Sequence, residues 1–133
     1  IWMNNHILVH RGNRESVLQM AEACKRTLNG KVSVFVFPEG TRSPDGNIQP
    51  FKEGAFILAK DNGVPIRPVV IDGTGKVLPK KSFWLKSHQV FTVRVLDEIP
   101  AAVVMSMEIC DLMELCRNSM IGALNDIRNQ AKS

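Results

Sequence analysis

The sequence predicts an α/β fold, with a mostly parallel or mixed sheet flanked by helices. Apolar runs rich in valine and isoleucine alternate along the chain with segments whose apolar residues recur at helical spacing. The order strand, helix, strand, helix, strand is typical of this class. The chain has 133 residues, 44% of them hydrophobic and 23% charged. That composition is ordinary for a globular chain, and the length of residues 1–133 fits one domain or part of one.

The first predicted elements are a short strand and a helix. Ile7-Leu8-Val9 is an apolar strand that leads into a turn at His10-Arg11-Gly12. Asn13 is placed as the N-cap of a helix that continues to about Asn29, where Gly30 stops it. The apolar face of this helix consists of Val17, Met20, Ala21, Cys24 and Leu28.

A buried strand and a second helix are predicted next. The run Val32–Phe37 contains three valines and almost no polar residue, which is typical of a strand covered on both faces. Ser43-Pro44-Asp45-Gly46 is a turn. The second helix spans about Glu53 to Asn62, with Gly63 as its stop. Its centre, Ala55–Ala59, is apolar all round, so we expect it to be buried on several sides.

The remaining sequence predicts two strands and a long helix. Ile66–Ile71 is an apolar strand, and Val90–Leu96 is another with alternating residues. The lysine-rich stretch Thr74–His88 is a loop or a broken strand and helix. The tail, from about Ser106 to Gln130, is an amphipathic helix. Its apolar stripe consists of Ile109, Leu112, Met113, Cys116, Met120, Ala123, Leu124 and Ile127.

The charge of the chain favours an anionic partner. There are 17 Lys and Arg against 13 Asp and Glu, giving a net charge of +4. Phosphate, an anionic lipid surface and nucleic acid all fit a basic protein. Nucleic acid is disfavoured because the chain has no tyrosine and its phenylalanines lie inside apolar runs. No apolar run approaches the twenty residues of a membrane-spanning helix.

The three cysteines predict neither a disulfide nor a metal site. Cys24, Cys110 and Cys116 include no Cys-x-x-Cys pair and have no histidine at ligand spacing. All three fall on predicted helices, so we expect buried free thiols. No cofactor is predicted.

The loop that follows the Val32–Phe37 strand has the chemistry of an anion site. Ligands of α/β sheets bind beyond the carboxyl ends of strands. Arg42 offers a forked, permanently charged donor, and Gly40 allows close approach of backbone N–H groups. Thr41 and Ser43 add hydroxyl groups.

Glu39 is the exception in this loop, because a carboxylate repels an anion. We expect it to hold Arg42 or Arg11 in place. Both arginines follow predicted strands, and neighbouring parallel strands would bring them to one edge of the sheet. A surface turn with incidental charges remains an equal alternative from the residues alone.

Four segments in order resemble the glycerophospholipid acyltransferase family of the 1-acylglycerol-3-phosphate type. Phe37–Ser43 is similar to its third conserved block, and Phe51–Ala55 to its Phe-Lys-x-Gly segment. Val64–Ile71 resembles the fourth block, and Leu8–Ser16 the second. One difference is His10, where the family has an acidic residue.

The resemblance implies that the chain is a partial acyltransferase domain, downstream of the catalytic block. Such enzymes move an acyl group from acyl-CoA or acyl-carrier protein to the free hydroxyl of lysophosphatidate, giving phosphatidate. The implied phosphate-binding residues are Arg11, Glu39, Gly40, Thr41, Arg42 and Lys52. The fourth block implies acyl-contacting or structural positions at Val64, Pro65, Ile66 and Pro68.

The family's catalytic block, His-x-x-x-x-Asp, is not found in the 133 residues, and we expect it upstream of Ile1. His10 and Glu15 have a similar spacing, but they lie inside the second block, where the glutamate can serve the first helical turn. We therefore expect no catalytic residue here and no activity of this chain alone.

Several alternatives and partners follow from the same resemblance. The acceptor could be another lysophospholipid or lyso-ornithine lipid, and a non-catalytic phospholipid-binding module is a rival of a different class. The parent is expected on the cytoplasmic side of a membrane, peripheral or anchored through its N-terminal part. An open sheet edge also makes a homodimer a candidate assembly.

Overall fold

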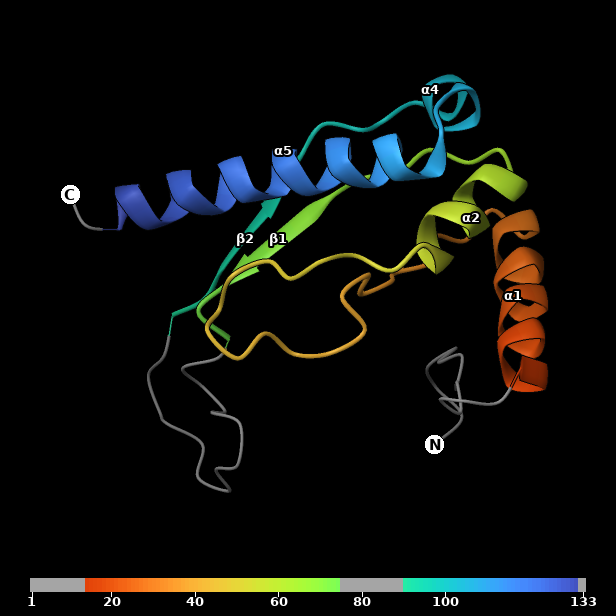
Figure 1. Cartoon of the computed structure of the whole chain (residues 1–133), viewed down its shortest axis with the longest axis horizontal. Helices are drawn as coiled ribbons and strands as arrows, with labels where there is room; N and C mark the ends of the chain where they lie inside the picture. Colours follow the sequence, from red (N-terminus) through yellow and green to blue (C-terminus); the bar gives the residue numbers. More distant parts are fainter. Residues whose placement is uncertain (1–13, 75–89, 132–133) are drawn as a thin grey trace. The chain divides into compact units, whose positions relative to one another are not determined.

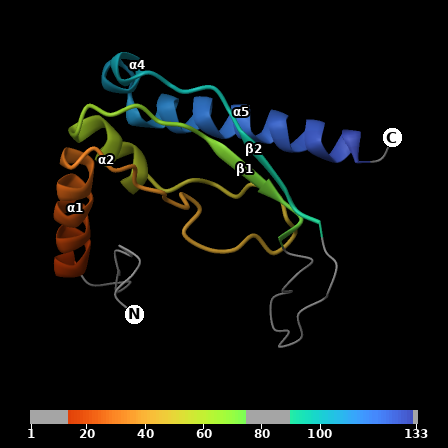
Figure 2. The same cartoon turned by 180° about the vertical axis from the view of Figure 1, so that it is seen from behind.

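The computed structural model describes residues 14–74 and 90–131. The chain divides into two compact units, residues 1–36 and residues 37–133. Figures 1 and 2 show the helices and strands from opposite sides. The predicted strand Ile7–Val9, its turn, the Asn13 cap and nearly all of Thr74–His88 lie outside the described residues.

In the first unit, helix α1 spans Arg14–Asn29, which confirms the predicted helix. Its end is closed by three backbone hydrogen bonds, including one from the N–H of Val32 to the carbonyl oxygen of Thr27 at 3.2 Å. The residue with the left-handed backbone is Lys31, with φ of +57°, rather than the glycine before it. The predicted boundary is therefore correct. A lysine occupies the left-handed position after the helix that glycine usually takes at the C-terminal end of a helix.

The predicted buried strand Val32–Phe37 is wrong. The structure assigns these residues no regular secondary structure. Val32, Phe35 and Phe37 are exposed, with more than half of their surface open to solvent. A strand is buried on both faces only when a layer covers each face, and α1 is the one regular element among the described residues of this unit.

The second unit contains three described helices: α2 (Gly54–Asp61), α4 (Ala101–Ser106) and α5 (Ile109–Gln130). Helices α2 and α5 confirm the predictions, although α2 is not buried all round, because Ile57 is 40% exposed. None of the helices in the described ranges is long and apolar enough to cross a membrane. The first part of the core joins the three helices and consists of Phe51, Phe56, Ala59, Val104, Leu112 and Cys116.

Strands β1 (Val69–Asp72) and β2 (Thr92–Val95) lie where strands were predicted, but they pair antiparallel. This corrects the mostly parallel sheet, because residue pattern identifies a strand without setting the direction of its partner. One face packs on α5, through a second core group of Val70, Ala123, Leu124 and Ile127. The other face exposes Ile71, Val93 and Val95. Figure 1 shows α5 alongside this hairpin.

Candidate anion-binding site

The predicted anion-binding residues lie in the segment 38–53, which connects the apolar run ending at Phe37 with α2 and is drawn orange to yellow in Figure 1. We call this segment the anion loop. The N–H of Gly40 donates to the carbonyl oxygen of Phe37 at 3.2 Å, which closes a turn. The N–H of Lys52 donates to the carbonyl oxygen of Pro38 at 2.8 Å. The two ends of the segment are thereby held together, and the Glu39–Arg42 turn lies beside the residues that precede α2.

Gly40 and Lys52 are in direct contact. Gly40 has a φ of +68°, and a Cβ built on it would lie 3.0 Å from Cε and 3.4 Å from Nζ of Lys52. The missing side chain therefore leaves the space in which the lysine lies. Two of the predicted phosphate-binding residues are thus brought together although twelve positions (52 − 40) separate them in the sequence.

Glu39 has a different partner from the expected arginine. Its Oε2 accepts a hydrogen bond of 2.9 Å from the backbone N–H of Gln49. No bond to Arg42 is found, and Arg11 lies outside the described residues. The carboxylate therefore holds Gln49, in the part of the loop that returns toward α2, and does not pair with Arg42.

The two cationic residues of the loop and Thr41 face solvent. Thr41, Arg42 and Lys52 are exposed. Within residues 14–74 and 90–131, no group accepts a hydrogen bond or ion pair from the side chain of Arg42 or Lys52. An incoming anion would meet two cations that no described carboxylate neutralises.

Asp45 organises the turn that follows, at the predicted Ser43–Gly46. Its carboxylate accepts hydrogen bonds from the N–H of Asn47 at 3.0 Å and from the hydroxyl of Ser43 at 2.9 Å. The backbone bond from Asn47, then the Ser43 hydroxyl, lower the pKa of Asp45. The side chain of Gln49 also donates to Asp45, at 3.3 Å. The sequence predicts the turn, but not the role of Gln49, because nothing in its local pattern marks it.

The Val64–Pro68 block packs in the second unit. Val64 and Ile66 pack against the first core group. Ile66 exchanges two backbone hydrogen bonds with Ile99, of 3.0 and 2.8 Å. Pro68 is buried, and Pro65 is exposed. These contacts give Val64, Ile66 and Pro68 a structural role, and the acyl-contacting role remains a prediction.

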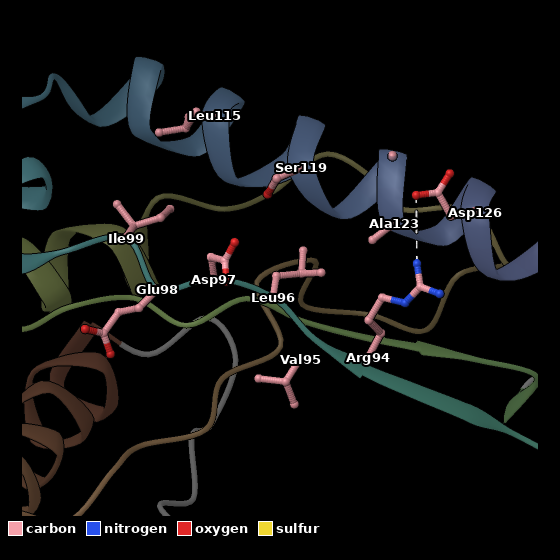
Figure 3. Close-up of a pocket in the computed structure, with 11 residues that line it drawn as sticks. Arg94, Val95, Leu96, Asp97, Glu98, Ile99, Leu115, Ser119, Ala123 and Asp126 are labelled. Carbon is pink, nitrogen blue, oxygen red and sulfur yellow. Dashed lines mark ion pairs between the residues drawn. The ribbon is translucent and has the colours of Figure 1, made fainter.

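A pocket of about 600 Å³ lies between β2, the residues after it and α5 (Figure 3). None of the predicted site residues lines it. Arg94 pairs with Asp126 across it at 3.8 Å, and Asp97 adds a second carboxylate, while the side chain of Glu98 points away from α5 in Figure 3 and pairs with Arg67. The one arginine of the pocket is thus already paired with a carboxylate, which disfavours an anion there. No group of His, Cys, Asp and Glu suited to a metal ion is found in the described ranges.

Comparison with known proteins places the chain in a family. The acyltransferase family model matches residues 1–72. The acl-2 1-acyl-sn-glycerol-3-phosphate acyltransferase of Caenorhabditis elegans is 32% identical over 98% of this chain and 47% of its own length. The human alpha enzyme of the same name is 31% identical, over 98% of this chain and 46% of its own length.

A chloroplast relative from Arabidopsis thaliana, LPAT1, has the same name and is 40% identical over 68% of this chain and 25% of its own length. The chain thus spans less than half the length of these relatives. No solved structure is significantly similar. Because the family model covers more than half of the 133 residues, the chain belongs to the acyltransferase family.

Proposed function

We propose that this chain carries the phosphate-binding part of a lysophosphatidate acyltransferase. The observation that carries the proposal is the Glu39–Lys52 loop. Its one carboxylate among the predicted site residues is bound to the Gln49 backbone, and its two cations are exposed without described partners. This is the arrangement expected for gripping a phosphate, because a guanidinium forms two parallel hydrogen bonds with phosphate oxygens.

The acyl transfer itself is assigned to the intact parent protein. There, the free hydroxyl of lysophosphatidate attacks the thioester carbonyl of acyl-CoA or acyl-carrier protein, and the thiol leaves. A His-x-x-x-x-Asp block outside these 133 residues supplies the base that accepts the hydroxyl proton, with the aspartate orienting the imidazole. The parent works at the cytoplasmic side of a membrane, where its lipid acceptor resides.

Binding of lysophosphatidate to the 133-residue chain tests the phosphate assignment. We expect Arg42→Lys to weaken affinity by roughly tenfold to a hundredfold, because a lysine cannot reproduce a forked, charge-assisted contact worth about 1.5–3 kcal/mol. Arg67→Lys is the matched control. Arg67 forms an exposed ion pair with Glu98 at 3.1 Å, and such pairs contribute about 0–1 kcal/mol.

The result that would contradict the proposal is equal affinity in Arg42→Lys and in the unchanged chain. A panel of acceptors separates the remaining alternatives. Lyso-ornithine lipid has no phosphate, so tighter binding of that lipid than of lysophosphatidate would move the assignment to a different headgroup. Binding by a parent protein that has no acyl transfer would identify a phospholipid-binding module.

A further inference from the structure

Helix α5 contacts the anion loop through two arginines that lie outside its apolar stripe. Arg117 and Arg128 are eleven residues apart (128 − 117), which is close to three helical turns, so they share one side of the helix. All of their described hydrogen bonds reach residues 46–49 and Asp72. The charged face of α5 therefore serves a segment some seventy to eighty positions away in the sequence.

Arg128 binds the outer part of the loop. Its Nη2 donates to the carbonyl oxygen of Gly46 at 2.6 Å, and its Nη1 to Oδ1 of Asn47 at 2.8 Å. The same guanidinium pairs with Asp72, at the end of β1, at 3.1 Å. A Cβ built on Gly46, where φ is +77°, would lie 3.2 Å from Nη2 of Arg128. The glycine thus permits both the backbone conformation and the close approach of the guanidinium.

Arg117 binds the arm of the loop that returns toward α2. Its Nη2 donates to the carbonyl oxygen of Ile48 at 3.0 Å, and its Nε to that of Gln49 at 3.3 Å. Gln49 is the residue whose N–H donates to the carboxylate of Glu39. One residue therefore connects the helix, through its carbonyl group, with the predicted phosphate-binding turn, through its N–H group.

We propose that Arg117 and Arg128 are positioning residues for the phosphate site. They fix residues 46–49 on α5, so that Gln49 holds Glu39 and the Gly40–Arg42 turn keeps its geometry. The guanidinium groups suit this task because their planar donors reach several acceptors at once, two for Arg117 and three for Arg128. The part of this inference that concerns ligand affinity rests on the proposed function.

The test combines hydrogen exchange with binding in the full chain. Arg117→Ala removes the charge-assisted hydrogen bond to the carbonyl group of Gln49. Because that bond holds Gln49 in place, we expect the hydrogen bond from its N–H to Glu39 to open more often and the amide to exchange about tenfold faster or more. Exchange at Leu112, in the helix core, should not change. Lysophosphatidate affinity should fall by roughly tenfold. Arg117→Lys, which keeps one donor group, should restore part of both effects.

Two further variants provide controls. Arg94→Ala removes an arginine that contacts α5 at Asp126 and Gln130 but not the loop, so it should change neither readout. Gly46→Ala displaces the Arg128 guanidinium through a change in the loop, because the added Cβ would lie 3.2 Å from its Nη2. Since α5 itself is unchanged in this variant, it keeps the inference testable if the α5 variants fail to fold. It should accelerate exchange at Asn47 and weaken binding in the same direction.

The outcomes separate this inference from the proposed function. Unchanged exchange at Gln49 in Arg117→Ala and at Asn47 in Gly46→Ala overturns the positioning role. Faster exchange with unchanged lysophosphatidate affinity also overturns it, because the loop geometry would then not matter for the ligand. Faster exchange in a chain that never binds lysophosphatidate refutes the proposed function, while it supports the contact between α5 and the loop.

Discussion

Substitution of Gly40 by alanine tests whether the backbone conformation of Gly40 and its contact with Lys52 matter for the loop. An alanine at a φ of +68° is strained by about 1–2 kcal/mol. Its Cβ would also lie 3.0 Å from Cε of Lys52, and the flexible lysine must shift away. We expect Gly40→Ala to lower the free energy of unfolding by about 1–2 kcal/mol, and to weaken lysophosphatidate binding because Lys52 moves.

Urea unfolding and a binding titration check this expectation. Gly54→Ala is the matched control, since nothing lies within 4 Å of its added Cβ and its backbone is helical. That variant should keep its affinity and lose no stability. If Gly40→Ala equals the unchanged chain in both measurements, the contact between Gly40 and Lys52 has no role in the site.

Among individual residues, the sequence predicts chemistry better than partners. The residue types of the loop identified Gly40 and Arg42 as candidates, and the family resemblance added Lys52. The partner of Glu39 could not be predicted, because it depends on the path by which the chain returns ten positions later (49 − 39). A carboxylate near an arginine suggests an ion pair, but a backbone N–H held at 2.9 Å satisfies the same oxygen.

The cysteines of α5 show how helical spacing decides the properties of a side chain. Cys116 lies in the predicted apolar stripe and is buried, and burial raises the pKa of its thiol to about 11. Cys110 lies six positions earlier, on the exposed side. The expectation that all three cysteines are buried is therefore wrong for Cys110, which was never part of the stripe.

These positions predict selective alkylation. Iodoacetamide at neutral pH should modify Cys110 first, because reactivity requires an accessible thiolate. Cys116 should react only after unfolding, and so should Cys24, whose pKa burial also raises. Peptide mass spectrometry of the native and the urea-unfolded chain measures the order. In Cys110→Ser, native modification should disappear, and rapid labelling of Cys116 would contradict its place in the core.

The elements themselves follow from periodicity to different degrees. The stripe of α5 was fully predictable, since every one of its residues is buried or half-buried. The strand near residues 92–95 was predictable as well. Its direction against β1 was not, because it depends on the connection between the strands, and residue alternation is the same in parallel and antiparallel pairs. The exposure of Val32 and Phe35 was missed for a related reason, since an apolar run contains no information about what covers it.

For the whole molecule, we expect binding of lysophosphatidate to be possible in this chain without catalysis of acyl transfer. The loop that is proposed to hold phosphate lies within the 133 residues, together with the helix that fixes it. The His-x-x-x-x-Asp block does not occur in them. We therefore expect the 133-residue chain to bind lysophosphatidate without catalysing acyl transfer, because loss of a general base costs on the order of a hundredfold to ten-thousandfold in rate.

Thiol release from acyl-CoA, measured with lysophosphatidate present, tests this separation. We expect no release above that of the buffer, with phosphate-dependent binding retained. A full-length relative, such as the human alpha enzyme, is the positive control. Turnover by the 133-residue chain that approaches this control would contradict the prediction and would make His10, five positions before Glu15, the candidate base. In that case His10→Ala should abolish turnover and leave lysophosphatidate affinity unchanged, since the imidazole would act on the hydroxyl proton and not on the phosphate.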